Sequence, residues 1–216
     1  MAERMHGSEM RGRLLESAAH LLAEHGPSGL STRKVAAAAG TSTMTLYSQF
    51  GSMPDLVRAV VDEGFKRLAD EFATVPQTDD PIADLGGVFA AYIAYARSNP
   101  DLYVIQFGSA SLGGYRGSGD DVKLTGRYSF EYIARAAERA VEAGRLRNEH
   151  PMWLASQLWT ALHGYVQLEL SGYYAPPESG VRYVLKPMMA ALVIGLGDDP
   201  EATAQSSKSW FSSATS

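Results

Sequence analysis

The sequence predicts an all-α protein. Apolar residues recur at intervals of three and four along most of its 216 residues, which is the period of an amphipathic helix. The periodic segments begin after Ser, Asp or Pro and end at Gly, as helices commonly do. A hydrophobic content of 45% is enough to bury a full core, so we expect one or two helical domains.

The first helix is expected to run from Ser8, its N-cap, to about His25. Its buried stripe is made of residues about one turn apart: Leu14, Ala18, Leu21 and Leu22. Gly26-Pro27 then ends the helix, and residues 1 to 7 are expected to be disordered. Arg11 and Arg13 lie near the helix start, where they can reach the phosphates of a nucleic acid.

Two short helices are predicted between residues 31 and 50. Ser31 can cap the first, and Gly40 supplies the positive φ that a tight helix exit needs. Ser42 can cap the second, which runs from Thr43 to Phe50. Two short helices joined by a glycine turn match the helix-turn-helix geometry that enters the major groove of DNA.

The second of these helices has two unlike faces. Leu46 and Phe50 are four apart and share the buried face. The outward set consists of Thr43, Met44, Thr45, Tyr47, Ser48 and Gln49. Packing alone does not require such a set, which favours a surface that reads DNA. The alternative is a helical hairpin in an ordinary bundle, in which AAAAG serves close packing.

A third, longer helix follows directly. Ser52 and Asp55 form a capping box, and Pro54 is tolerated in the first turn of a helix. This helix is expected from residue 53 to 74, where it can link two domains. Residues 1 to 55 would form the DNA-binding domain.

The stretch from Leu14 to about Val61 resembles the TetR family of transcriptional regulators, named after the tetracycline repressor. The resemblance rests on LLESAAHLLAEHG, LSTRKVAAAAGTS, TLYSQF and the SxxxL of SMPDL, which occur in this order and spacing. Two positions depart from the family pattern. Met53 stands where a lysine is common, and Gln49 stands where histidine or another bulky residue is common. Without that lysine we expect one phosphate contact fewer per subunit.

The resemblance implies that the second short helix lies in the major groove. The predicted DNA contacts are Thr32, Arg33, Ser42, Thr43, Met44, Thr45, Tyr47 and Gln49. Thr32, Arg33 and Tyr47 would bind phosphates. Thr43, Met44, Thr45 and Gln49 would meet base edges. The groove helix contains no Arg or Lys, so it cannot recognise guanine by a bidentate cation. Specificity is therefore expected from several weaker contacts and from DNA shape.

Residues 75 to 196 are expected to form a helical bundle for ligand binding and dimerisation. Helices are predicted at 81 to 98, from 100 onward, at 122 to 143, from 151 onward, and at 179 to 196. Residues 108 to 121 are expected to be a mobile loop, and Pro187 should kink or interrupt the last helix. Residues 197 to 216 are expected to be a loose tail, which Trp210 and Phe211 can anchor.

A single helix-turn-helix makes few DNA contacts, so we expect a homodimer on double-stranded DNA. Its operator would be an inverted repeat with half-sites about 34 to 36 Å apart, or a multiple of this. The last two long helices are apolar over more than one face, as a dimer interface requires. The candidate residues are Leu154, Leu158, Ala161, Leu162, Tyr165, Leu168, Leu170, Val181, Val184, Leu185, Met188, Met189, Leu192 and Gly195. The alternative is a larger core within one chain.

The family resemblance also implies a small-molecule effector, mostly apolar, that controls a repressor. Aromatic walls with a few polar groups suit such a pocket. The candidates are Phe89, Tyr92, Tyr103, Phe107, Tyr128, Tyr132, Trp159 and His163. Trp159 to Gly164 resembles a W-x-x-x-H-G element of some C-terminal domains in the family. The alternative for each residue is an ordinary place in the core.

Composition and motifs argue against several other classes. The chain has no cysteine, no 18-residue apolar run and no signal-peptide pattern, so we expect a cytoplasmic protein without a membrane segment. It contains no nucleophile elbow, phosphate loop or zinc motif. His163 and Glu169, the best acid–base candidates, are six apart and do not share a helix face. We therefore expect no enzyme activity, cofactor or metal. A helical protein–protein interaction module without DNA binding is the main alternative.

The net charge of −5 is unevenly distributed. Residues 1 to 70 carry eight Lys and Arg against eight Asp and Glu, whereas residues 71 to 216 carry 11 against 16. The acidic excess therefore lies outside the predicted DNA-binding domain, and the overall charge does not argue against DNA as a partner.

Overall fold

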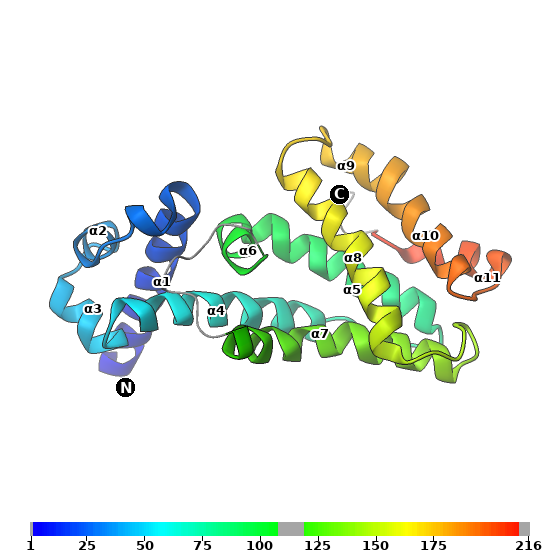
Figure 1. Cartoon of the computed structure of the whole chain (residues 1–216), viewed down its shortest axis with the longest axis horizontal. Coiled ribbons are helices and arrows are strands. Elements are labelled where there is room, and N and C mark those ends of the chain that lie inside the picture. Colours follow the sequence, from blue (N-terminus) through cyan, green and yellow to red (C-terminus); the bar gives the residue numbers. More distant parts are fainter. Residues whose placement is uncertain (1, 108–118, 212–216) are drawn as a thin grey trace. The chain divides into compact units, whose positions relative to one another are not determined.

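The computed structural model describes residues 2 to 107 and 119 to 211, with side chains for residues 7 to 107, Gly126 and residues 129 to 211. Every regular element in these ranges is a helix (Figure 1), which confirms the all-α prediction. The elements are α1 (Ala2–Gly29), α2 (Thr32–Ala38), α3 (Thr43–Phe50), α4 (Met53–Ala73), α5 (Pro81–Ser98), α6 (Pro100–Phe107), α7 (Gly119–Glu142), α8 (Pro151–Leu170), α9 (Pro177–Gly180), η2 (Val181–Leu185), α10 (Lys186–Gly195), α11 (Pro200–Ser206) and η3 (Ser207–Ser209).

The chain forms two compact units. The first unit contains Met1–Arg67 and Asn99–Gly126, and the second contains Leu68–Ser98 and Arg127–Ser216. α6 therefore belongs with the N-terminal helices and not, as expected, with residues 75 to 196. Leu102 and Ile105 of α6 are buried in the core of the first unit. Burial of these two side chains gives the physical reason for the assignment.

α1 begins at Ala2, six residues before the predicted N-cap Ser8. The prediction of disorder was therefore wrong for residues 2 to 7. Ala, Glu, Arg and Met, which occupy positions 2 to 5, are strong helix formers and need no capping serine. The predicted break is confirmed, because Gly26 leaves the helical conformation with a φ of 65°.

α7 begins at Gly119, three residues before the predicted start at Val122. The rest of the predicted loop, residues 108 to 118, lies outside the described residues. α7 ends at Glu142, and Gly144 follows with a φ of 69°. This left-handed conformation strongly favours glycine, so the predicted end of the helix is confirmed.

The predicted interruption at Pro187 is confirmed. The π-helical turn η2 lies directly before α10, and the N–H of Lys186 donates to the carbonyl of Val181, five residues back. Pro187 has no N–H, and its ring crowds the carbonyl four residues before it. The wider π turn accommodates both effects.

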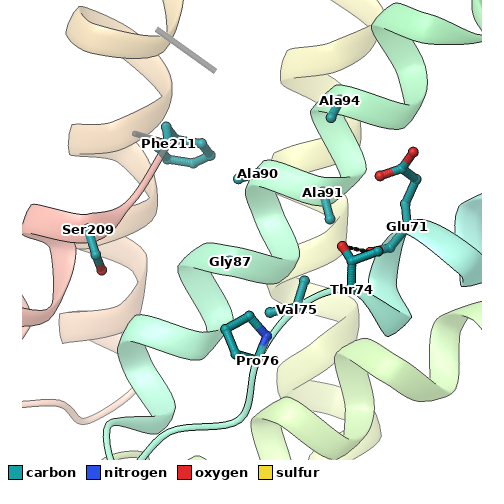
Figure 2. A pocket seen from close by; sticks show the side chains of 10 residues that line it. All are labelled: Glu71, Thr74, Val75, Pro76, Gly87, Ala90, Ala91, Ala94, Ser209 and Phe211. Carbon is teal, nitrogen blue, oxygen red and sulfur yellow. Dashed lines mark hydrogen bonds between the residues drawn. The ribbon is translucent and has the colours of Figure 1, made fainter. Parts of the chain in front are cut away.

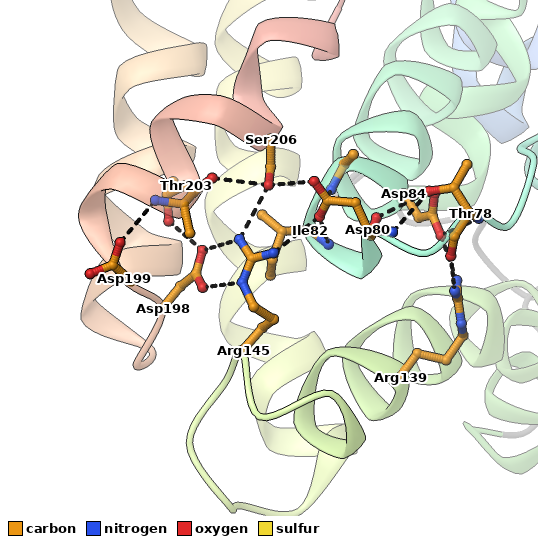
Figure 3. Close-up of polar contacts among 12 residues, drawn as sticks. Thr78, Asp80, Ile82, Asp84, Arg139, Arg145, Asp198, Asp199, Thr203 and Ser206 are labelled. Atoms are coloured by element: carbon orange, nitrogen blue, oxygen red, sulfur yellow. Dashed lines mark hydrogen bonds and ion pairs between the residues drawn. The ribbon is translucent and has the colours of Figure 1, made fainter.

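The prediction of a loose tail after residue 196 was wrong, because residues 200 to 206 form α11. Figure 3 shows the polar contacts of α11 and of the residues just before it. Arg145 donates two hydrogen bonds to Asp198, at 2.6 and 2.9 Å, and one to Ser206 at 3.2 Å. Ser206 in turn donates to Asp80 at 2.6 Å. The hydrogen bonds with Asp198 raise the pKa of Arg145, and this network ties α11 to the start of α5.

Trp210 completes the attachment of the C-terminal segment. Its Nε1–H donates to the carbonyl of Ile82 at 3.0 Å, and its ring meets Phe89 edge-on with centroids 5.9 Å apart. Gly86 makes this close approach possible, since a Cβ there would lie 1.8 Å from Cδ1 of Trp210. Trp210 is therefore part of the core of the second unit.

Glu169, one of the two acid–base candidates, is occupied in holding α8 to α5. It accepts hydrogen bonds from Arg97 at 2.7 and 3.0 Å and from Tyr165 at 2.7 Å. Burial, followed by this hydrogen bond to Glu169, raises the pKa of Tyr165 far above its usual value. Tyr165 consequently keeps its proton and serves as the donor.

Candidate nucleic-acid interface and ligand site

A helix-turn-helix occupies residues 31 to 50, as predicted. Ser31 Oγ accepts a hydrogen bond from the N–H of Lys34 at 3.3 Å and so caps α2. Gly40 adopts a φ of 66°, and the N–H of Thr41 donates to the carbonyl of Ala36 at 2.8 Å. This bond closes the tight exit from α2 before α3 begins.

α3 is anchored to the core of the first unit by one side of the helix. Ser42 Oγ accepts from the N–H of Thr45 at 3.1 Å and caps the helix. Leu46 is fully buried, and Phe50 packs against the same core while remaining partly exposed. The guanidinium of Arg11 lies 4.9 Å from the centroid of the Phe50 ring. Arg11, predicted to reach phosphates, therefore covers Phe50 through a cation–π contact.

The remaining side chains of α3 are accessible. Met44 is 79% exposed and Tyr47 is 50% exposed. Ser42 and Ser48 are exposed, and three further side chains are partly exposed: Thr43, Thr45 and Gln49. On α2, Thr32 is partly exposed and Arg33 is exposed. The structure thus brings all eight predicted DNA contacts to one helix-turn-helix and leaves each of them within reach of a partner.

Ser52 caps α4 as predicted. The N–H of Asp55 donates to Ser52 Oγ at 3.2 Å, and the Ser52 hydroxyl donates back to the Asp55 carboxylate. The same carboxylate accepts from Arg58 at 2.8 Å. Met53, which stands where the family commonly has lysine, packs against the core of the first unit.

Lys34 is a candidate contact that the sequence prediction omitted. It is exposed and lies beside Arg33 in the first turn of α2, where helix N–H groups also favour anions. The two neighbouring cations offer more positive charge to a phosphate backbone than Arg33 alone. Their adjacency in the sequence was the available signal.

Three predicted ligand residues meet in one hydrogen-bonded group in the second unit. Trp159 Nε1 lies 3.2 Å from the hydroxyl of Tyr92, which lies 2.9 Å from Nδ1 of His163. Indole and amide N–H groups can only donate, so Tyr92 accepts from Trp159, and Nε2 of His163 accepts from Gln167 at 3.3 Å. The proton of the neutral imidazole then lies on Nδ1, which donates to Tyr92. Burial lowers the pKa of His163, which favours the neutral ring that this arrangement needs.

Aromatic contacts connect this group to a small cavity. Phe72 stacks near Tyr92 with centroids 6.4 Å apart and contacts Tyr132 with centroids 5.7 Å apart. Tyr132 lines a cavity of about 140 Å³ between α4, α5 and α7. Other lining residues include Phe72, Gln77, Val88, Arg135, Ala136 and Arg139. This is the candidate ligand site, since it combines apolar walls with a few polar groups.

The other predicted ligand residues lie elsewhere. Phe89 is buried against Trp210. Tyr103 and Phe107 belong to the first unit, where Phe107 meets Phe65 edge-on at 5.5 Å between centroids. The prediction that these two line the same pocket as Tyr92 was wrong, because α6 buries its apolar face against the N-terminal helices. The side chain of Tyr128 lies outside the described residues.

A second cavity, of about 330 Å³, lies against α5 and is drawn in Figure 2. Small residues of α5 form one side: Gly87, Ala90, Ala91 and Ala94. Val75 and Pro76, which follow α4, and Phe211 close the other sides. Among the predicted ligand residues whose side chains the structure describes, none lines this cavity.

α8 and α10 each combine a buried and an exposed apolar side. Leu154, Leu158 and Leu162 of α8 are buried, as are Leu185 at the end of η2 and Met189 of α10. The exposed apolar or small residues of these two helices are Met152, Trp153, Gly164, Leu168, Met188, Ala191, Ile194 and Gly195. Part of the predicted dimer set therefore belongs to the chain's own core, and part remains free for a partner.

Among the residues that the structure describes, none of the helices has both the length and the hydropathy of a membrane-spanning segment. Within the same residues, no three His, Cys, Asp or Glu side chains are grouped as a metal site would require.

Two family models match the chain. Residues 14 to 60 match the bacterial regulatory proteins of the tetR family. Residues 85 to 192 match the tetracyclin repressor-like C-terminal domain. The first match covers the helix-turn-helix, and the second covers most of α5 and all of α7 and α8.

Related proteins agree with these matches. An uncharacterized HTH-type transcriptional regulator of Mycobacterium tuberculosis is 28% identical over 165 residues, which is 75% of this chain and 71% of the relative. A putative tetR family transcription regulator from Shewanella sp. PV-4 has the same fold, with a TM-score of 0.69, 19% identity, and coverage of 85% of this chain and 95% of that one. A protein of unknown function from Rhodococcus sp. RHA1 also has this fold, with a TM-score of 0.70 and 23% identity. The match covers 88% of this chain and 96% of that one. The chain belongs to the TetR family of transcriptional regulators and carries its DNA-binding domain.

Proposed function

We propose that this protein is a repressor that binds an inverted-repeat operator as a homodimer and releases it when a small, mostly apolar effector binds. The observation that carries the proposal is the exposed outer side of α3, which is rich in hydroxyl groups and is held on a helix anchored by the buried Leu46. A buried anchor keeps the outer side chains in a fixed geometry, as base recognition requires.

The proposed DNA contacts divide into two kinds. Arg33, Thr32 and the Tyr47 hydroxyl bind phosphates, and these contacts set the position of α3 without reading sequence. Thr43, Thr45, Met44 and Gln49 face base edges: hydroxyls serve as donor or acceptor, Gln pairs with adenine, and methyl groups touch thymine. Ser42 stays close to the DNA as the cap of α3.

The proposed homodimer uses the exposed sides of α8 and α10. Trp153 and Leu168 on α8, and Met188 and Ile194 on α10, are large apolar side chains in contact with solvent. Apolar side chains gathered on two neighbouring helices favour a partner surface. Two copies related by a twofold axis would present two α3 helices to the two halves of an inverted repeat.

The proposed effector site is the cavity lined by Phe72 and Tyr132. Phe72 connects it to Tyr92, which contacts Trp159 and His163. α4 begins in the first unit, directly after α3 in the sequence, and its last residues belong to the second unit. Phe72 is one of these last residues. A ligand that moves Phe72 therefore acts on a helix shared with the DNA-binding unit. A coupling free energy of about 1 to 3 kcal/mol changes affinity roughly 5- to 150-fold.

Selection of DNA fragments retained by the purified protein tests the proposal. We expect fragments that share an inverted repeat, and an affinity for them that falls steeply as salt rises, because phosphate contacts release counterions. Weak, salt-independent retention without a shared sequence would instead support a protein-interaction module.

Tyr47→Phe tests the phosphate role of the α3 tyrosine. Loss of a hydrogen bond to a charged group should weaken binding about tenfold, and by a similar factor for every duplex. The measurement is a titration of labelled operator and of an unrelated duplex. A loss confined to the operator would contradict a phosphate contact.

Gln49→Ala tests base reading. We expect a relaxed preference at one base pair in each half-site, because the substitution removes a bidentate partner for adenine. Repeating the fragment selection with the variant measures this preference. An unchanged selection profile would remove Gln49 from the base-reading residues. Gln205→Ala, the same substitution at an exposed position of α11, serves as the control.

A further inference from the structure

The cavity between α4, α5 and α7 has room for one aromatic ring. Its volume is about 140 Å³, below the roughly 300 to 1,000 Å³ of pockets for drug-sized molecules. A protein cavity of about 150 Å³ is sufficient to bind benzene. One aromatic ring therefore fits within the cavity.

The walls of the cavity favour an aromatic ligand. Phe72 and Tyr132 line it from α4 and α7, with their ring planes at 38° to each other. Val88 and Ala136 supply aliphatic surface from α5 and α7. A flat ring placed here can make offset or edge contacts with both aromatic side chains, which such rings prefer over direct face-to-face stacking.

The charged groups that line the cavity are two arginines and one aspartate. Asp84 is nearly buried and is fully engaged: it accepts from Arg139 at 2.6 Å and from Thr78 at 2.9 and 2.7 Å. These contacts are drawn in Figure 3. Arg139 also donates to the carbonyl of Thr78. The charge of Asp84 is thus matched by that of Arg139.

Arg135 leaves an excess positive charge at this cavity. It lies four residues before Arg139 and so on the same side of α7. It forms an ion pair with Glu131 at 3.9 Å, which is longer than a hydrogen bond. Glu131 and Glu138 line a separate groove beside His150, which Arg135 also borders. The Arg135 side chain is 73% exposed and can turn toward a ligand in the cavity at little cost.

We propose that the effector is a single-ring aromatic carboxylate, with its ring against Phe72 and Tyr132 and its carboxylate on Arg135. The proposal rests on the proposed function and names the chemical class of the molecule that controls it. The ring supplies the apolar contact, and the carboxylate supplies the charge that Arg135 lacks within this cavity. A planar guanidinium and a carboxylate match in geometry as well as in charge.

Calorimetric titration of the purified full chain with benzoate and with its neutral analogue benzamide tests the proposal without DNA. We expect benzoate to bind at least tenfold more tightly than benzamide. Arg135→Gln should weaken benzoate binding about tenfold, as expected for loss of a charge-assisted hydrogen bond. The same variant should leave benzamide binding within about twofold, because it removes charge and not the apolar walls.

Two further variants separate charge from space. Arg147→Gln removes an arginine outside the cavity and should leave both affinities unchanged. Ala136→Leu fills the cavity and should reduce the binding of both ligands, provided that thermal unfolding shows the variant to be folded. If Ala136→Leu does not fold, the Arg135→Gln variant still tests the ligand class. The Arg135 side chain is exposed, so its replacement should not affect folding.

The ligand class and the regulatory function can fail separately. The ligand class would be overturned by any of three results: equal affinity for benzoate and benzamide, no binding of either, or normal benzoate binding by the Arg135→Gln variant. Each of these results counts against the ligand class even if the protein binds an operator. Benzoate binding through Arg135 by a chain that ignores every selected duplex would overturn the proposed function and leave the ligand class standing.

Discussion

Ile194→Asp is expected to convert the protein from a dimer to a monomer and to reduce operator affinity about 100- to 10,000-fold. Ile194 is an exposed apolar residue of α10, on the side where Ala191 and Gly195 are also exposed. A carboxylate there would be buried without a partner in the proposed interface, which is strongly unfavourable. Each helix-turn-helix alone would then lose the gain that comes from binding two half-sites at once. Light scattering and an operator titration measure the two effects.

The matched control for Ile194→Asp is Ala204→Asp, which adds the same charge at an exposed position of α11. The control should remain dimeric and bind the operator normally. An Ile194→Asp variant that stays dimeric would show that this part of α10 lies outside the interface. A monomeric variant with full operator affinity would show that one helix-turn-helix is sufficient.

Trp210→Ala is expected to lower the free energy of unfolding by about 3 to 5 kcal/mol, the usual cost of truncating a large buried aromatic side chain. Trp210 is 2% exposed, packs edge-on against Phe89, and donates a hydrogen bond to Ile82. The substitution leaves a cavity at Gly86, because that glycine gives the ring its space. Urea denaturation followed by circular dichroism measures the change.

Tyr173→Ala is the matched control for Trp210→Ala, since Tyr173 is 75% exposed in the same unit. We expect a change of at most about 0.5 kcal/mol, as for most surface substitutions. A Trp210→Ala variant that loses less than about 1 kcal/mol would show that the C-terminal segment contributes little to the core, contrary to its burial.

The helix-turn-helix could be predicted because its determinants are local. Ser31 and Ser42 cap helices that begin at the next residue, Gly40 closes a turn with neighbours only a few positions away, and Leu46 shows its burial through helical spacing. Short-range hydrogen bonds of this kind depend on a few consecutive residues. The sequence alone was therefore sufficient for the α2–turn–α3 unit and for the outward set on α3.

The errors concern contacts between distant segments. The tail looked loose because nothing near Asp198 or Trp210 indicates their partners, Arg145 and Ile82, which are 53 and 128 residues away. The assignment of Tyr103 to the ligand-binding domain failed for the same reason. An aromatic residue at helical spacing is buried in any core, and its spacing does not show which core. The cavity beside Tyr132 depends on residues from three helices and could not be located from the sequence.

The membership of α6 in the first unit has a consequence for modularity. The backbone passes between the two units three times, after Arg67, after Ser98 and after Gly126. A fragment that stops after α4 would lack Leu102 and Ile105 and leave their places in the N-terminal core unfilled. A functional chimera that takes its operator preference from a relative therefore has to include α6 together with the N-terminal helices of that relative. Because α6 is separated from those helices in the sequence, a single recombination event that exchanges only the N-terminal segment is disfavoured.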